Sequence, residues 1–298
     1  MSDDDPIDRR TYLKGAGAGG LLGLVGTAGC VGGGGGGSGS SGSDGGSGGG
    51  SNGSGGGSDT IAIGSDIPYN PFEYRTNDGE LVGFDVDIAD AVFGEQLGMT
   101  PEFQATSFDG IIPSLNNGNF RVIMSAMTIN DERDQKVDFS DPYFTAYQTI
   151  VVLENSDITS RDDLRGETVG VQKGTTGADA AAQLESDFGG DLTIREYDQI
   201  PAAFNALINN QVVAVINDNT VSAQFVQENE GQVRFVEGEG AAAEQGNNAP
   251  PYLTLTVEEY GIAFRQDDDD LRTRVNEALA TIRDNGTYEE IYNEYFAG

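Results

Sequence analysis

The sequence predicts an α/β fold of two lobes, and three observations support this prediction. From Asp59 onward, short β-branched runs alternate with amphipathic segments, a pattern typical of parallel sheets covered by helices. The roughly 240 residues of this part are more than one such sheet usually needs. Residues 32–57 hold 17 glycines among 26 residues, so they are expected to separate the folded part from the N-terminus as a flexible coil.

Strands and helices are expected to follow one another along the folded part. Phe84, Ile88 and Val92 stand four residues apart in a segment that ends at Gly98, which indicates an amphipathic helix. The last segment begins with "TYEE", a capping-box pattern. The expected strands are 60–65, 101–105, 120–128, 167–172, 212–218 and 232–238, and the expected helices are 83–98, 107–118, 177–188, 200–210, 219–229 and 271–286.

The composition of the chain excludes several classes of function. One cysteine and no histidine remove internal disulfides, histidine-based catalysis and the commonest zinc ligands. The formal net charge is −33, from 49 acidic and 16 basic residues. Nucleic acid is therefore not an expected partner, because phosphate binding needs clustered Lys and Arg. Acids spread along the whole chain favour a halophilic protein over an ordinary acidic one, since high salt screens their repulsion.

Residues 1–29 are predicted to be an export signal. The run "RRTYLK", which begins at Arg9, resembles the twin-arginine export motif, although Asp8 stands where Ser or Thr is usual. The apolar stretch that follows is too short to span a bilayer. "TAGC" then resembles a lipobox, so Cys30 is expected to be lipidated and residues 30–58 to form a flexible tether. An incidental thiol is the alternative interpretation of this cysteine.

Polar residues follow three of the expected strands, where ligands bind in open α/β sheets. Thr128 and Arg133 follow the first, and an arginine fork with a nearby hydroxyl suits a carboxylate, although Arg133 also has acidic neighbours to pair with. The run "GTTG" follows the second and opens a helix, which suits an anion or a plain helix cap. Asp218 follows the third, where it suits an ammonium group or a cap. Together these residues would complement the backbone half of a free amino acid.

The sequence from about residue 60 to residue 298 resembles the extracellular solute-binding proteins of polar amino-acid ABC importers. The landmarks of this resemblance occur in order and are "GSDIPYNPFEY", "GELVGFDVDIADAV", "FDGIIPSLNNG", "MSAMTINDERDQKVDFSDPY", "DLRGETVGVQKGTTG" and "GTYEEIYNEYF". The resemblance implies a periplasmic-binding-protein-like (Venus-flytrap) fold whose two lobes close on the ligand about two hinge strands. By analogy, lobe 1 comprises residues 59–145 and 258–298, and lobe 2 comprises residues 146–257.

The resemblance also assigns a role to individual residues. Arg133 would bind the α-carboxylate of the amino acid, together with the hydroxyl of Thr128 and the backbone N–H groups of Thr175 and Thr176. These groups are the donors of the implied site, and no metal or other cofactor is implied.

The remaining implied residues bind the ammonium group and the side chain of the ligand. Asp218 and the carbonyl of Ala126 would accept hydrogen bonds from the α-ammonium. Asp66 would face a polar or cationic end, while the rings of Tyr69 and Phe108 stack on the side chain, unless they are ordinary core residues. Asp66 favours a basic or amide side chain, such as that of Arg, Lys, His or Gln.

The implied function is capture of an amino acid outside the cell and its delivery to the permease subunits of an ABC importer. The protein would act as a monomer held at the outer face of the membrane by its lipid anchor, and not as an enzyme. Two alternatives remain at this point: a ligand-sensing domain that acts through a membrane receptor in trans, and a small-acid dehydratase on the same fold.

Overall fold

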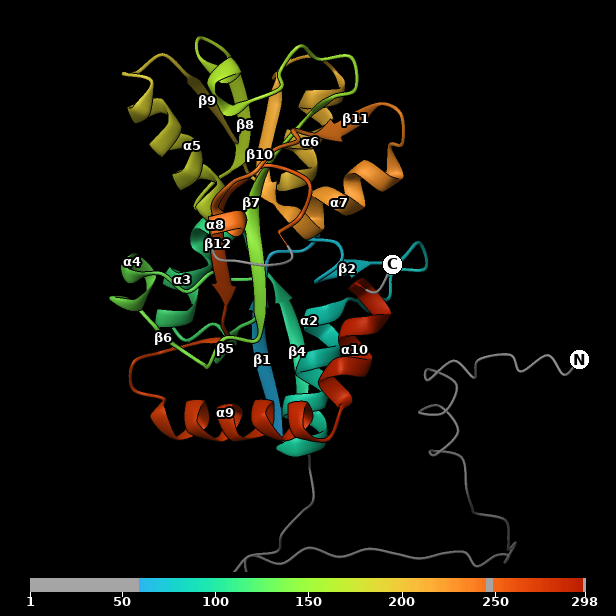
Figure 1. Cartoon of the computed structure of the whole chain (residues 1–298). Helices are drawn as coiled ribbons and strands as arrows, with labels where there is room; N and C mark the ends of the chain where they lie inside the picture. The colour runs from blue at the N-terminus through green and yellow to red at the C-terminus, as the bar shows by residue number, and fades with distance from the viewer. Residues whose placement is uncertain (1–58, 245–248, 297–298) are drawn as a thin grey trace, which may run out of the picture. The chain divides into compact units, whose positions relative to one another are not determined.

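The computed structural model describes residues 59–244 and 249–296. It contains two larger β-sheets, each flanked by helices, and two long strands that run between them (Figure 1). The predicted export signal, the lipidation of Cys30 and the tether up to residue 58 lie outside the described residues. None of the helices described is long and apolar enough to cross a membrane.

The first sheet, in the lower half of Figure 1, has the strand order β4-β1-β5-β13-β6. β1 is parallel to β4 and β5, whereas β13 is antiparallel to β5 and β6. The strands are β1 (Asp59–Ser65), β4 (Met99–Ala105), β5 (Val122–Ile123), β6 (Asp138–Phe139) and β13 (Ala263–Phe264), beside a hairpin of β2 (Tyr74–Arg75) and β3 (Leu81–Val82). The helices are α2 (Phe84–Ala89), its π-helical continuation η1 (Asp90–Gln96), α3 (Phe108–Asn116), α4 (Asp131–Asp134), α9 (Asp269–Asp284) and α10 (Thr287–Phe296).

The second sheet, in the upper half, has the order β11-β7-β10-β8-β9, with β12 also paired to β7. β8 is parallel to β9 and β10, whereas β7 is antiparallel to β10, β11 and β12. The strands are β7 (Phe144–Leu153), β8 (Thr168–Gln172), β9 (Thr193–Tyr197), β10 (Ala214–Asp218), β11 (Val233–Phe235) and β12 (Thr254–Tyr260). The helices are the 3₁₀ turn η2 (Arg161–Leu164), α5 (Thr176–Asp187), α6 (Ile200–Ile208), α7 (Asn219–Glu228) and α8 (Ala241–Glu244).

β7 and β12 are the two strands that connect the lobes. They pair antiparallel from Phe144 opposite Tyr260 to Thr149 opposite Thr254. In the sequence, β1 to β6 precede the strands of the second sheet and β13 follows them. The chain therefore passes between the lobes twice, once through β7 and once through β12. The two-lobe fold with two hinge strands is confirmed, and the proposed lobe boundaries stay a prediction.

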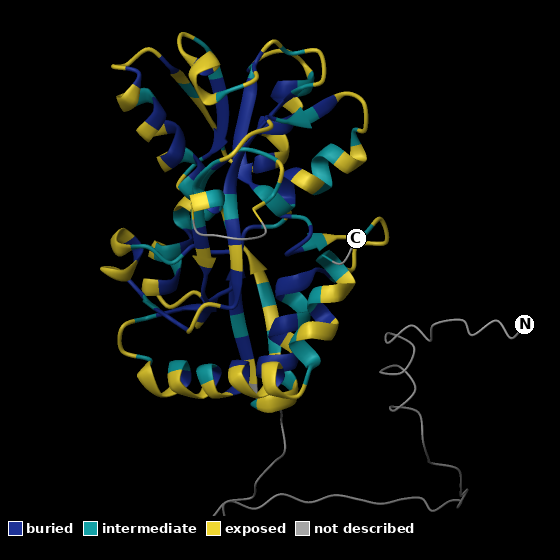
Figure 2. Ribbon diagram, viewed as in Figure 1, coloured by how far each residue is buried: buried dark blue, intermediate teal, exposed yellow. Residues whose placement is uncertain are grey.

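A cluster of buried aromatic rings fixes the hinge strands to the first lobe. Phe144 of β7 and Tyr260 of β12 stack with ring centroids 5.6 Å apart. Phe72 packs edge-on against both rings, at 5.1 and 5.4 Å, and Phe84 of α2 packs against Phe144 at 5.4 Å. Figure 2 shows the buried residues concentrated along the sheets and the inner faces of the helices. Because such rings bury large apolar areas, the lower ends of the hinge strands are held firmly in this core.

Three sequence expectations about the fold need correction. Both sheets are mixed rather than parallel, because β7, β12 and β13 run antiparallel to their neighbours. The strand expected at 120–128 is limited to Val122–Ile123, since Ala126 has a φ of 46° and leaves the extended conformation. β9 was not predicted, because its side chains are half-buried or exposed and show no apolar alternation.

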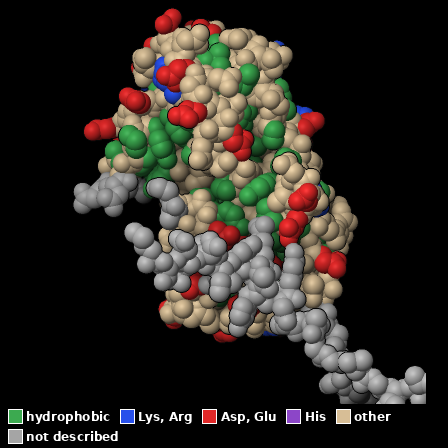
Figure 3. All heavy atoms as spheres, turned by 90° about the vertical axis from the view of Figure 1, so that its right-hand side faces the viewer, with side chains coloured by type: hydrophobic (Ala, Val, Ile, Leu, Met, Phe, Trp, Pro, Cys, Tyr) green, Lys and Arg blue, Asp and Glu red, His purple; other side chains and the backbone are tan. Residues whose placement is uncertain are grey.

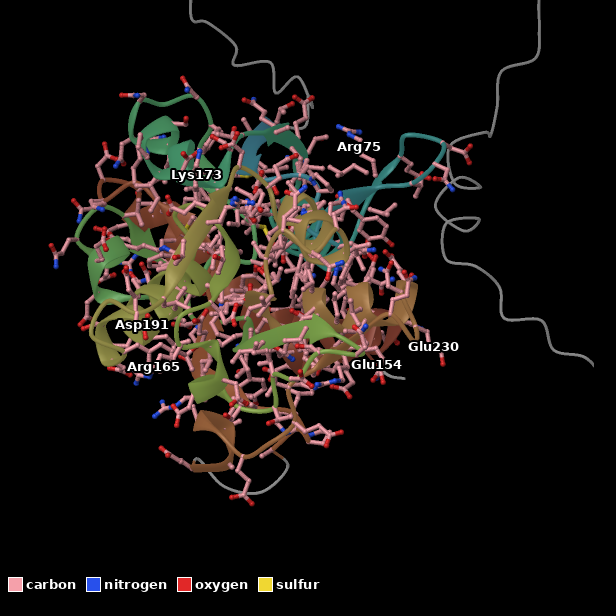
Figure 4. All side chains as sticks on the ribbon, turned by 90° about the horizontal axis from the view of Figure 1, so that it is seen from above. Arg75, Glu154, Arg165, Lys173, Asp191 and Glu230 are labelled. Atoms are coloured by element: carbon pink, nitrogen blue, oxygen red, sulfur yellow. The ribbon has the colours of Figure 1, made fainter. Side chains whose placement is uncertain are left out.

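The surface of the described residues is rich in acids. On the face shown in Figure 3, acidic side chains are scattered over both lobes, with few Lys or Arg side chains among them. The view from above in Figure 4 places Arg165, Asp191 and Glu230 at the outer edge of the second lobe. Arg121 forms two hydrogen bonds with Asp268 at 2.9 and 3.0 Å. It therefore contributes to packing at the start of α9, away from the site described next.

Candidate functional site

All nine residues predicted to contact a ligand line one cavity between the two lobes. They come from the ends of β1, β4, β5, β8 and β10 and from the loops and helices that follow these strands. Ser125 and Gln172 complete the lining. The predicted residues gathered there are Asp66, Tyr69, Phe108, Ala126, Thr128, Arg133, Thr175, Thr176 and Asp218.

Arg133 is the cationic group among the described residues that line this cavity, and its position is fixed by several contacts. It lies in the single-turn helix α4, whose N-cap Asn130 accepts a hydrogen bond from the Arg133 backbone N–H at 2.9 Å. Its guanidinium donates to the Thr128 carbonyl at 2.7 Å and to the Gly174 carbonyl at 3.1 Å, and lies 5.2 Å from the centroid of the Phe108 ring. The side chain is thus held as a buried donor, suited to a carboxylate.

The start of α5 forms a second group of donors. Thr175 is the N-cap, and its hydroxyl accepts from the Ala178 N–H at 3.3 Å and donates to the Gln172 carbonyl at 2.8 Å. A side chain at Gly177 would collide with the Ile216 carbonyl, 2.9 Å from the ideal Cβ position, so glycine lets the helix start close to β10. The first N–H groups of a helix have no acceptor within the helix, and they favour an anion there.

Two acids face the cavity from opposite lobes. Asp218 ends β10 and accepts hydrogen bonds from the Tyr69 hydroxyl and the Gln148 amide. Burial, and secondarily the negative charge of Glu258, raise the pKa of Asp218 to about 7. Asp66 follows β1 and accepts from the Gln172 amide, and burial raises its pKa to about 6. Both carboxyls are therefore poised to gain from a cationic partner.

Sequence reasoning missed four polar residues at this site, namely Ser125, Gln148, Gln172 and Glu258. Glu258 is buried on β12, behind the cavity wall, and accepts hydrogen bonds from the hydroxyls of Thr128 and Thr176, each at 2.7 Å. A hydroxyl has a single proton, so Thr128 and Thr176 present lone pairs to the rest of their surroundings. This arrangement differs from the predicted donation by Thr128 to a ligand carboxylate, for which its proton would have to leave Glu258.

The signal that could have found these residues is a polar side chain inside an apolar strand. Gln148 interrupts "YQTIVV" in β7, and Gln172 ends the apolar strand β8. Each is buried, and a buried amide in a strand needs a specific partner. Nothing in the local pattern names that partner, because it comes from a distant segment.

Hydrogen bonds cross the cavity from one lobe to the other. The Tyr69 hydroxyl reaches Asn217 at 3.2 Å as well as Asp218, and Gln199 donates to the Ile67 carbonyl at 2.9 Å. The hydroxyls of Thr128 and Thr176 lie 3.3 Å apart. These contacts describe a closed arrangement, in which residues from both lobes surround the cavity.

A cavity lined by strand-end residues of two lobes, with two hinge strands beside it, defines a two-lobe binding protein. Residues 61–298 match the family model of the bacterial extracellular solute-binding proteins, family 3. The chain belongs to this family.

Two curated relatives and one solved structure illustrate the similarity. The chain is 33% identical over 237 residues to a probable histidine-binding protein of Neisseria gonorrhoeae, covering 79% of this chain and 82% of the relative. It is 31% identical over 242 residues to the arginine-binding extracellular protein ArtP of Bacillus subtilis strain 168, covering 81% and 88%. An ancestral arginine-binding protein bound to arginine matches with a TM-score of 0.71 and 36% identity, covering 80% of this chain and 98% of that structure.

Proposed function

We propose that this protein captures a polar or basic amino acid, with a basic or amide side chain favoured, outside the cell and delivers it to the permease of an ABC importer. The observation that carries the proposal is the arrangement of opposite charges in one cavity. Arg133 and the start of α5 offer donors for an α-carboxylate, while Asp218 offers an acceptor for an α-ammonium from the end of β10. The curated relatives include proteins named for binding histidine and arginine, which supports the same ligand class.

A cationic side chain is favoured by the balance of charge around the cavity. Asp66, Asp218 and the neighbouring Glu258 are acidic, against the one guanidinium of Arg133. The α-ammonium and α-carboxylate of an amino acid add no net charge, so a third charged group on the ligand must be positive to offset the acids. Asp66 is the acid left for that group once Asp218 binds the ammonium, and Tyr69 and Phe108 supply aromatic faces.

The proposal extends to how the protein is placed and where it works. The twin-arginine-like run and the lipobox at Cys30 support export followed by lipid anchoring at the outer face of the membrane. The net charge of −33 supports a protein adapted to high salt. We propose that it acts as a monomer through its own two lobes, with the permease subunits as its partner.

The test is a thermal-shift screen of the purified protein in molar salt against the twenty amino acids, followed by calorimetry of those that stabilise it. A ligand at 100 times its Kd should stabilise the fold by about 2.7 kcal/mol. Stabilisation confined to Arg, Lys, His or Gln is the expected result. Stabilisation by acidic amino acids alone would contradict the proposed role of Asp66. The screen is repeated after unfolding and refolding, so that a ligand carried through purification does not hide the shift.

A further inference from the structure

Two carboxyl groups, Glu73 and Asp85, lie buried beneath the wall of the cavity without lining it. Both side chains are fully inaccessible to solvent, at 0% exposure. Asp85 is in the first turn of α2, and Glu73 follows Phe72 in the turn whose backbone pairs with Tyr69. The two carboxyls bind neighbouring residues, since the Ser125 hydroxyl donates to Glu73 and the Ala126 N–H donates to Asp85. Two ionised carboxylates buried side by side would repel each other, and a proton on one of them removes that repulsion and allows a hydrogen bond between them.

The donors around the pair indicate which carboxyl holds that proton. Asp85 accepts from the Ala126 backbone N–H at 2.9 Å with one oxygen, and from the Tyr143 hydroxyl at 2.8 Å with the other. Glu73 accepts from the Ser125 hydroxyl at 2.8 Å with Oε1, while no hydrogen bond of normal geometry from the described residues reaches its buried Oε2, although the Ser65 hydroxyl lies near the carboxyl. An acceptor with two donors favours the ionised form, and an oxygen without one favours the protonated form.

The electrostatics of the pair agree with this geometry. Burial and the charge of Asp85 raise the pKa of Glu73 well above its ordinary value, with a smaller contribution from the charge of Asp66. Burial also raises the pKa of Asp85, to about 6, against the effect of its hydrogen bonds from Ala126 and Tyr143. The charged and titratable groups that face the pair are thus Asp66, Tyr69 and Tyr143.

The pair is hydrogen-bonded to the segment of the cavity wall that has a strained backbone, Ser125–Ala126. Ala126 holds a φ of 46°, a conformation that is costly for a residue with a side chain. Its N–H is held by Asp85, and the Ser125 hydroxyl is held by Glu73. That same hydroxyl accepts from the Asp66 N–H at 2.9 Å. Three hydrogen bonds therefore connect the pair to the wall: one from Ala126 to Asp85, and two that run from Asp66 through the Ser125 hydroxyl to Glu73.

We propose that Glu73 and Asp85 share one proton, carried on Oε2 of Glu73 and donated to Asp85, and that this pair positions the Ser125–Ala126 wall of the amino-acid cavity. The positioning role rests on the proposed function, whereas the proton itself is a property of the free protein. Glu73 and Asp85 are positioning residues, since they reach the cavity only through Ser125 and Ala126.

The test compares two amide variants, Glu73→Gln and Asp85→Asn, that differ in whether the new NH₂ group meets a hydrogen-bond acceptor or a donor. Glu73→Gln keeps an acceptor for Ser125 and supplies an N–H donor to Asp85, so it imitates the protonated acid. Asp85→Asn replaces an acceptor by an NH₂ group that faces a donor. We expect Glu73→Gln to bind the amino acid within about threefold of the unaltered protein, and Asp85→Asn to bind at least tenfold more weakly.

Two measurements on the free protein test the proton directly. Infrared spectroscopy at pH 8.5, where Asp66 and Asp218 are ionised, should show a protonated-carboxyl band that is lost in Glu73→Gln. Because the pKa of Glu73 is higher in the folded protein than in the unfolded chain, the free energy of unfolding falls as the pH rises from the unfolded-state pKa toward the folded-state pKa. The folding constant of the unaltered protein should therefore fall about tenfold per pH unit relative to Glu73→Gln.

A missing band, or a folding constant whose ratio to that of Glu73→Gln does not change with pH, would overturn the shared proton. Equal loss of affinity in Glu73→Gln and Asp85→Asn would overturn the positioning role. If Asp85→Asn does not fold, Tyr143→Phe replaces it, and the expected result is a several-fold loss of affinity with the fold retained. A protein that binds no amino acid refutes the proposed function, and the positioning role with it, while the two measurements on the free protein still decide the proton.

Discussion

Four of the buried carboxyl groups around the cavity fall into two pairs that differ in what surrounds them. Glu73 and Asp85 take their hydrogen bonds from the first lobe alone, through Ser125, Ala126 and Tyr143. Asp66 and Asp218 face the cavity and take theirs partly across it, Asp66 from Gln172 and Asp218 from Tyr69. Burial raises the pKa of all four groups.

The difference shows that buried acids can have a structural role or a ligand-binding role, depending on where their hydrogen-bond partners lie. A carboxyl whose partners all belong to one lobe keeps them when the lobes separate, so its proton stays in place and its role is structural. A carboxyl that meets its partners across the cavity loses them on opening, and a ligand cation can replace them. Burial therefore has two consequences. In Glu73 and Asp85 it fixes the geometry of the cavity wall, and in Asp66 and Asp218 it makes binding of a cation favourable.

The largest expected effect comes from Asp218→Asn, which breaks the cavity-facing pair. Removing one partner of a buried charge pair costs about 3–5 kcal/mol, so affinity for the amino acid should fall by roughly 10²- to 10⁴-fold. Without ligand the variant should melt at a higher temperature than the unaltered protein at pH 8. The reason is that the raised folded pKa of Asp218 makes its ionisation a cost that is incurred as the pH rises through about 7.

Calorimetry and thermal melting at pH 8 check the two halves of this prediction. Asp85→Asn is the matched control, because it makes the same chemical change in the sealed pair. It should lower stability, because Asp85 accepts from the backbone N–H of Ala126, which cannot turn away from an amide NH₂. The Tyr69 hydroxyl and the Gln148 amide beside Asp218 are side chains that can turn to accept from it. Equal destabilisation by both variants would remove the distinction between the pairs.

The next effect is a dependence of affinity on pH that differs between ligands. An α-ammonium needs Asp218 ionised, so the affinity for glutamine should rise up to about tenfold per pH unit below pH 7 and level off above it. A cationic side chain also needs Asp66 ionised, so below pH 6 the affinity for arginine should rise up to about 100-fold per unit. Titration calorimetry in two buffers of different ionisation enthalpy counts the protons released.

The contrast between the two ligands is what tests Asp66. Parallel pH profiles for arginine and glutamine would assign the side-chain end of the cavity to another group. A slope for glutamine that persists above pH 8 would point to a titrating group other than Asp218.

The sequence predicted the residues that line the cavity far better than the groups behind them. Thr128, Arg133 and Asp218 stand just past apolar strands, and a strand end in an open α/β sheet is a position that local pattern reveals. Gln148 and Glu258 lie on the hinge strands, which pair antiparallel between segments more than 100 positions apart. Local periodicity carries no information on such pairing, and it gave no reason to expect mixed sheets.

The buried pair was hidden for a related reason. Glu73 in "NPFEY" and Asp85 in "GFDVD" resemble surface acids in a chain with 49 of them, and only the folded structure brings them together under Ala126. The positive φ of Ala126 is equally invisible, since the run around it predicts a strand.

The smallest expected effect belongs to Glu258→Gln, which tests whether a carboxylate behind the cavity helps to hold the lobes together. Oε2 of Glu258 accepts from Thr128 of one lobe and Thr176 of the other, and opening must break at least one of these bonds. The amide keeps an acceptor but loses the charge that strengthens both bonds, a difference of about 1 kcal/mol. Amino-acid dissociation should therefore become roughly fivefold faster, with the association rate little changed.

Thr256→Val is the matched control, because Thr256 bonds the other oxygen of Glu258 at 2.9 Å and does not line the ligand cavity. Stopped-flow measurements on both variants separate the rates. Slower dissociation from Glu258→Gln would mean that its charge repels the ligand carboxylate more than it links the lobes.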